Sequence, residues 1–114
     1  MSESTSVELA RDLVQLAAES VLYTIGFRKL LGADETLTGT PVVTSSPALT
    51  FSDIGINTED VNENNLTIAV NKGVQFRVPK QTPGEADKQY SLVIECGTSG
   101  GNTRAVKATL KVRV

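Results

Sequence analysis

The sequence predicts an all-β sandwich, and three observations support this fold class. From Val21 onward, β-branched residues recur in short runs, and Gly, Pro, Asn, Asp and Ser separate these runs. That pattern is typical of many short strands joined by turns. The chain has 114 residues, of which 39% are apolar and 21% are charged, as expected for one globular domain with a single core. We expect this domain to cover residues 20–114 and an arm to cover residues 1–19.

About seven strands are expected in the domain. They lie near residues 20–28, 36–44, 48–56, 65–70, 73–79, 88–97 and 103–114. Pro41 and Pro47 would remove hydrogen-bond donors from a central strand, so the segments around them are expected at sheet edges or strand ends. Seven short strands with a turn signal between neighbours are typical of an immunoglobulin-like antiparallel β-sandwich.

The last two strands show the clearest pattern. Apolar Tyr90, Leu92, Ile94 and Cys96 occupy alternate positions, and the same alternation returns from residue 108 to residue 114. A period of two buries one face of a strand. The loop at residues 98–102 contains two glycines and an asparagine, which supply the positive φ angles of a hairpin loop. The sequence therefore predicts an antiparallel hairpin, with Cys96 as a buried thiol.

The first nineteen residues follow a different spacing. The apolar residues Leu9, Ala10, Leu13, Val14 and Ala17 recur at helical intervals. Thr5 and Glu8 match a capping box. A short amphipathic helix is predicted, which either covers the end of the sandwich or reaches a neighbouring subunit. Over so few turns the arm could equally be extended when bound.

The residues needed for most catalysis are absent. The chain has no histidine, and Cys96 is its single cysteine, which excludes serine-histidine and cysteine-histidine catalysis and leaves no ligand set for zinc. The acidic residues fall in apparent turns, where solvation explains them. We expect no enzyme activity, no catalytic residue, no cofactor and no metal.

One acidic loop begins like a calcium-binding loop. Residues 60–64 place oxygen-bearing side chains at alternate positions, but Asn65 stands where that motif needs glycine and Asn71 where it needs glutamate. An Asx-rich turn is the simpler interpretation.

The charge pattern disfavours nucleic acid and membranes as partners. The formal net charge is −2, and basic residues are scattered apart from the pair Arg28 and Lys29. The longest nearly apolar run, residues 21–27, is far too short to span a bilayer. The polar, acidic start does not resemble a signal peptide.

From residue 21 onward the layout resembles a group of small phage virion proteins with immunoglobulin-like folds, found as capsid decoration, cement or fibre-associated subunits. The resemblance rests on a tyrosine-containing opening strand, a Leu-Leu-Gly turn with acids, a threonine-rich strand and a closing hairpin, at residues 21–25, 30–35, 36–40 and 90–114. The tryptophans common in such proteins are absent, and the arm has no counterpart.

This resemblance implies a virion structural protein, made in the host cytoplasm and located on the capsid surface. As a capsid decoration or cement protein it would bind and stabilise the shell of the major capsid protein or other virion subunits, with contacts between copies in a homo-oligomer or lattice. A phage tail, neck or fibre-attachment subunit is an alternative. A carbohydrate- or calcium-dependent adhesion module is an alternative of another class.

The arm is where we expect the partner contact. Its apolar side chains Val7, Leu9, Leu13 and Val14 would be buried against the partner, and exposed loops would supply a polar rim.

Overall fold

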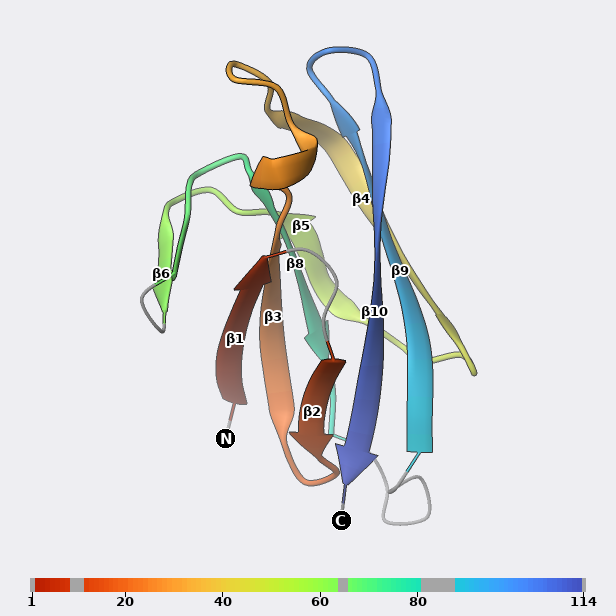
Figure 1. Ribbon diagram of the computed structural model, residues 1–114. Coiled ribbons are helices and arrows are strands. Elements are labelled where there is room, and N and C mark those ends of the chain that lie inside the picture. Colours follow the sequence, from red (N-terminus) through yellow and green to blue (C-terminus); the bar gives the residue numbers. More distant parts are fainter. Residues whose placement is uncertain (1, 9–11, 64–65, 81–87, 114) are drawn as a thin grey trace.

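Two four-stranded β-sheets pack face to face in a computed structural model of the chain (Figure 1). The structure describes residues 2–8, 12–63, 66–80 and 88–113. The first sheet has the strand order β1 (Ser2–Glu8), β3 (Ser20–Gly26), β8 (Gly73–Val78), β5 (Ser52–Ile56). The second has the order β2 (Asp12–Leu16), β10 (Thr103–Arg113), β9 (Lys88–Thr98), β4 (Leu37–Ser46). The predicted all-β sandwich is confirmed.

Two smaller elements lie outside these sheets. β6 (Val61–Glu63) and β7 (Leu66–Ile68) pair with each other in a small antiparallel ladder. A single 3-10 turn, η1 (Arg28–Leu30), follows β3 and carries no buried side chain.

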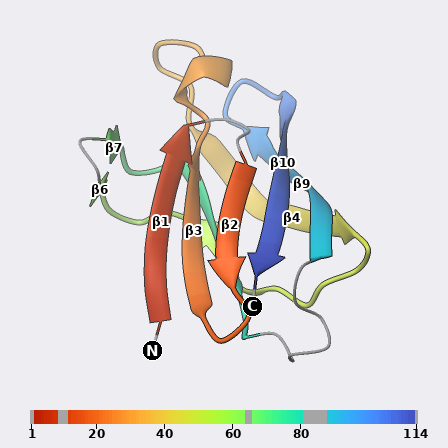
Figure 2. The ribbon, with the colours of Figure 1, turned by 60° about the horizontal axis from the view of Figure 1, so that its bottom comes forward.

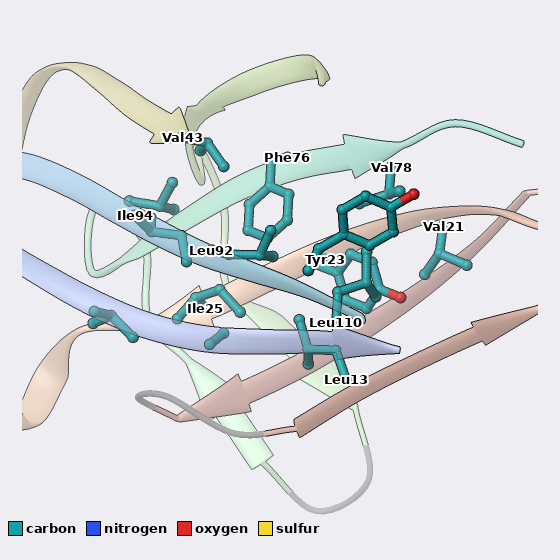
Figure 3. Packing of buried hydrophobic residues seen from close by; sticks show 14 of the residues in the cluster. Leu13, Val21, Tyr23, Ile25, Val43, Phe76, Val78, Leu92, Ile94 and Leu110 are labelled. Carbon is teal, nitrogen blue, oxygen red and sulfur yellow. The ribbon is translucent and has the colours of Figure 1, made fainter. Parts of the chain in front are cut away.

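The core lies between the two large sheets and follows from alternation along each strand. In β9 the side chains of Tyr90, Leu92 and Ile94 point inward and are at most 2% exposed. Aromatic rings fill the centre, where the rings of Phe76 and Tyr23 pack with centroids 5.6 Å apart (Figure 3). The ring of Phe51 packs against Phe76 from another side, with centroids 5.7 Å apart. Full burial of one large apolar side chain contributes about 1.5–3 kcal/mol, so this layer holds the sheets together.

The predicted hairpin at the end of the chain is confirmed. β9 and β10 pair antiparallel without a register shift, from Thr103 opposite Gly97 to Val112 opposite Lys88. Gly101 adopts a φ of 85° in the loop, a conformation that favours glycine. The Cys96 thiol is buried, as expected.

The predicted N-terminal helix is wrong. Residues 2–8 and 12–16 form β1 and β2, which add one outer strand to each sheet. A helix of a few turns is marginal by itself, whereas two open sheet edges satisfy the backbone groups of an extended chain. The apolar pattern fits both structures, because Leu13 and Ala17 are also alternate inward positions of an extended segment.

The strand count and the antiparallel arrangement also need correction. The described residues form ten strands and not about seven, because β1, β2 and β6 were not expected as strands. β1 runs parallel to β3, and β2 runs parallel to β10. The sheets are therefore mixed, although every other strand pair is antiparallel.

A buried glutamine anchors β2 to the core. Gln15 is 1% exposed, and its Oε1 accepts a hydrogen bond of 3.1 Å from the Tyr23 hydroxyl. Its Nε2 donates to the carbonyl oxygens of Glu19 and Val78 at 2.8 and 3.4 Å. These bonds join β2, an outer strand of the second sheet, to β3 and β8 of the first sheet.

Gln15→Ala should lower the free energy of unfolding by about 1–3 kcal/mol, because it removes hydrogen bonds from a buried site and leaves a small cavity. Urea denaturation followed by circular dichroism measures this. Gln89→Ala, at an exposed position of β9, is the control and should change stability by less than about 0.5 kcal/mol. Equal effects of the two changes would show that Gln15 is not an anchor.

Candidate functional site

Three connections meet at one end of the sandwich, and we call them together the loop end. They are residues 28–36 between β3 and β4, residues 69–72 between β7 and β8, and residues 99–102 between β9 and β10. Figures 1 and 2 show the first and third at the same end of the molecule. A surface built from several loops on a rigid sheet scaffold is a common place for binding residues.

Backbone hydrogen bonds join the three segments of the loop end. The N–H of Phe27 donates to the Lys72 carbonyl at 2.8 Å, and the N–H of Leu37 donates to the Asn71 carbonyl at 2.8 Å. The N–H of Ser99 donates to the Thr36 carbonyl, also at 2.8 Å. The first segment therefore lies between the other two and is bonded to both.

Glu35 contacts all three segments. Its Oε1 accepts a 2.9 Å hydrogen bond from the Gly32 N–H within its own loop. Its Oε2 accepts hydrogen bonds from the Thr98 hydroxyl and, at 3.3 Å, from the Asn102 side chain, both in the β9–β10 hairpin. The Nζ of Lys72 donates to the Glu35 carbonyl at 3.1 Å. Glu35 therefore adds hydrogen bonds that involve all three segments to the backbone bonds between them.

The same hydrogen bonds lower the pKa of Glu35 to about 2, from an ordinary value of 4.5. The Thr98 hydroxyl is the largest cause and the Gly32 N–H the next, while partial desolvation opposes them. Because the pKa is lower in the folded than in the unfolded state, ionised Glu35 stabilises the fold above pH 4.5. This contribution is lost as the pH falls from 4.5 toward 2.

Gly100 lets the hairpin approach this carboxylate. A Cβ at Gly100 would lie 2.5 Å from Oε2 of Glu35, closer than real Cβ contacts. The carboxylate would have to move away, and its hydrogen bonds to Thr98 and Asn102 would be strained.

The turn at residues 69–72 is held independently of Glu35. The Lys72 N–H donates to the Ala69 carbonyl at 3.1 Å, and Asn71 has a φ of 63°, a left-handed conformation that asparagine tolerates. Asp60 Oδ1 accepts the Val70 N–H at 2.9 Å. The turn therefore presents Val70, which is 39% exposed, from a fixed backbone.

Buried Asn57 supports this turn from below. It is 1% exposed, and its Nδ2 donates to the Ala69 carbonyl at 2.9 Å. Its Oδ1 accepts the Gly73 N–H at 2.9 Å, and its carbonyl accepts the Asn71 N–H at 3.1 Å. Nothing in the sequence singled out Asn57, because its partners lie 12 to 16 residues away.

The chemistry available at the loop end is recognition. Its exposed side chains carry both charge signs, amides, a hydroxyl and an apolar group: Arg28, Lys29, Asp34, Val70, Asn71, Ser99 and Asn102. Within the described ranges, no cluster of three or more acidic, cysteine or histidine side chains could hold a metal ion. The described part of the chain also contains no helix long and apolar enough to span a membrane.

The candidate calcium loop uses its oxygens within the protein. In addition to the bond from Val70 to Asp60, the Thr67 hydroxyl donates to Asn62 Oδ1 at 2.6 Å. Asn65 lies outside the described residues. These bonds are those of a turn stabilised by Asx side chains.

Of the four residues expected to contact a partner, the structure describes the side chains of Leu13 and Val14, and these point to opposite faces of β2. Leu13 is 3% exposed and belongs to the core, whereas Val14 is 62% exposed on the opposite face of β2. Val7 lies in β1, opposite Ile25 in the register with β3, and Leu9 lies outside the described residues. Alternation along the strand separates Leu13 from Val14, which the expected helix would have placed on one side.

Sequence reasoning did not identify Glu35 or Thr98 as site residues. They are 63 positions apart, and an acid in a turn is ordinarily solvated. The one available signal was the proximity of Glu35 to a Leu-Leu-Gly turn that precedes a strand.

No family model and no curated protein sequence matches the chain. Among solved structures, the solution structure of amebosin aligns with 97% of this chain and 97% of its own, at 7% identity and a TM-score of 0.44. The crystal structure of the cysteine protease inhibitor EhICP2 from Entamoeba histolytica aligns with 98% of this chain and 97% of its own, at 10% identity and a TM-score of 0.49.

These neighbours overturn the function expected from the sequence. They are amebosin and a cysteine protease inhibitor, and not phage proteins, so the expected capsid decoration or cement protein is wrong. The neighbours likewise do not support the two alternatives, a phage tail, neck or fibre-attachment subunit and, from another class, a carbohydrate- or calcium-dependent adhesion module. No comparison tests the family resemblance itself, which stays a prediction.

Glu35→Gln should lower the melting temperature at pH 7, because a neutral amide oxygen accepts hydrogen bonds more weakly than a carboxylate. The difference from the wild type should shrink between pH 4.5 and pH 2, where the wild-type carboxyl becomes protonated. Thermal unfolding at several pH values measures both effects. Asp34→Asn, in the same loop, is the control, and a pH-independent difference for Glu35→Gln would contradict the account.

Gly100→Ala should raise the pKa of Glu35 from about 2 toward 4.5, because the new methyl group displaces the carboxylate from its donors. An NMR titration of the Glu35 carboxyl carbon measures the pKa directly. Gly55→Ala places a methyl group in open space and should leave it unchanged. An unchanged pKa in Gly100→Ala would show that the hairpin does not press on Glu35.

Proposed function

We propose that this chain is a non-enzymatic protein-binding domain of the immunoglobulin-like type and that it binds its partner with the loop end. The strand orders support this fold type. β3, β8 and β5 follow the order of strands B, E and D of an immunoglobulin domain, and β4, β9 and β10 follow the order of strands C, F and G. β1 and β2 each add an outer strand that runs parallel to its neighbour.

The observation that carries the proposal is the set of hydrogen bonds around Glu35. It holds three loops in one arrangement before any partner arrives. Ordering loops on binding costs free energy, so a surface that is already ordered keeps more of its contact energy as affinity. In immunoglobulin variable domains the binding loops also cluster at one end of the sandwich.

The side chains at the loop end fit a protein partner. Val70 offers an apolar contact on a turn that is held by hydrogen bonds, and Arg28, Lys29 and Asp34 of the β3–β4 connection add exposed charges of both signs to the same loop end. An apolar centre with a polar rim is the usual composition of a protein interface. The net charge of −2 and the mixture of signs disfavour a polyanion.

A photo-crosslinking pair tests the proposal. A benzoylphenylalanine at Ser99 lies at the loop end, and one at Ala48 lies in the β4–β5 connection at the opposite end. In an extract of cells that make the protein, the Ser99 probe should form a defined adduct and the Ala48 probe should not. Excess wild-type protein should suppress the adduct.

Two variants make the competition specific. Glu35→Ala and Val70→Asp should compete at least about tenfold less well than the wild type, a loss of 1.4 kcal/mol in binding. Val42→Asp, at an exposed position of β4, should compete like the wild type. Adducts from the Ala48 probe alone, or equal competition by all variants, would contradict binding by the loop end. A purified cysteine protease, the enzyme class that EhICP2 is named for inhibiting, is a defined first protein to assay.

A further inference from the structure

β2 is a short outer strand, and its own residues contain few of the features that protect a free edge. Within the part of the chain that the structure describes, it pairs with β10 alone, in a continuous register from Asp12 opposite Thr109 to Leu16 opposite Arg113. Its five residues include no proline, lysine or glycine and no bulge. Outer strands without such features readily pair with another chain.

The other outer strand of this sheet and the neighbouring outer strand β5 are interrupted. β4 contains Pro41 and a register shift between Thr38 and Val42. β5 has a register shift between Ser52 and Gly55, with Asp53 at a φ of 54°. Both irregularities disturb the row of backbone groups that a further strand would need.

Among the described residues, Glu19 makes hydrogen bonds to the free edge of β2. The N–H of Ala17 donates to the Arg113 carbonyl at 2.7 Å, which shows that its backbone groups face β10. Backbone groups alternate in direction along a strand, so those of Leu16 face the free edge. There the Leu16 N–H donates to Glu19 Oε1 at 2.8 Å, and the Leu16 carbonyl accepts the Glu19 N–H at 3.0 Å.

Val14 and Leu16 share this orientation and also present apolar side chains. They are 62% and 47% exposed. Leu13, which precedes them, and Gln15, which lies between them, are buried. The inner face of β2 therefore fixes it to the core. Val14 and Leu16 are exposed on its outer face, and Glu19 binds both edge-facing backbone groups of Leu16.

We propose that the free edge of β2 is a strand-pairing site for β2 of a second copy of this chain, and that Glu19 keeps this site closed. The sequence of β2 suits self-pairing. In an antiparallel register centred on Val14, the two Val14 residues lie opposite each other, and Leu16 lies opposite Asp12 of the second copy. Arg113, the register partner of Leu16, then stands in the same row as that acid.

The charges tolerate this arrangement. The two copies of Lys111, each beside Val14 in the register, would be three strand spacings apart, roughly 14 Å. That exceeds the screening length of about 8 Å at physiological salt. The pairing is isologous, so it closes as a dimer with twofold symmetry and does not continue as a filament.

Glu19 opposes this pairing because of where its bonds lie. In the centred register Leu16 of each copy would exchange backbone hydrogen bonds with Asp12 of the other copy. Both edge-facing groups of Leu16 are already bonded to Glu19. While Glu19 stays in place, only the two Val14 residues can exchange backbone hydrogen bonds. Two strands joined through one residue from each copy are too short a ladder to be stable.

Sedimentation equilibrium over a wide concentration range tests the proposal. Glu19→Ala should dimerise with a dissociation constant at least about tenfold below that of the wild type, which is 1.4 kcal/mol in association free energy. Glu19→Ser provides a second opening variant with a polar side chain in the turn. Glu59→Ala removes an exposed acid elsewhere and should behave like the wild type. Circular dichroism confirms that each variant is folded.

A double variant locates the contact. In Glu19→Ala with Val14→Pro, the proline removes an edge-facing N–H without removing a bond to β10, so the double variant should return to the wild-type association. The proposal is overturned if both Glu19 variants stay as monomeric as the wild type. It is equally overturned if they dimerise and Val14→Pro has no effect, because the contact would then lie elsewhere.

Discussion

The loop end depends on one ionised carboxylate held by neutral donors from separate parts of the chain. Glu35 accepts hydrogen bonds from Gly32, Thr98 and Asn102, and its own carbonyl accepts the Lys72 ammonium. Hydrogen bonds to a charged group are stronger than those between neutral groups, which explains both the low pKa of Glu35 and the fixed spacing of the loops. The sandwich beneath supplies the positions, and Glu35 joins them into one surface.

The outer strand β2 needs both an attachment to the core and a partner for its edge-facing backbone groups. β2 is held to the core by Gln15, and its turn is held by Glu19, which bonds both edge-facing groups of Leu16. Residues 15–19 therefore both attach β2 to the core, through Gln15, and occupy part of its free edge, through Glu19. A sandwich has open edges, and each needs such a device if the chain is to stay free of unwanted strand pairing.

The sequence predicted what depends on local pattern and missed what depends on distant partners. Alternation at Tyr90, Leu92 and Ile94 identified the β9–β10 hairpin, because apolar residues at every second position fit a strand and do not fit a helix. At Leu13 and Ala17 a helical and an extended interpretation were both possible, and the open edges of two sheets decided between them. Glu35 could not be recognised, because its partner Thr98 is 63 residues away.

Backbone ¹⁵N relaxation of the free protein tests most directly whether the loop end is ordered before binding. The account predicts order parameters near 0.85 for residues 28–36, 69–72 and 99–102, like those of rigid strands. Order parameters below about 0.6 in these three segments would contradict it. The loops would then be flexible in the free protein, and the hydrogen bonds of Glu35 would not fix their arrangement.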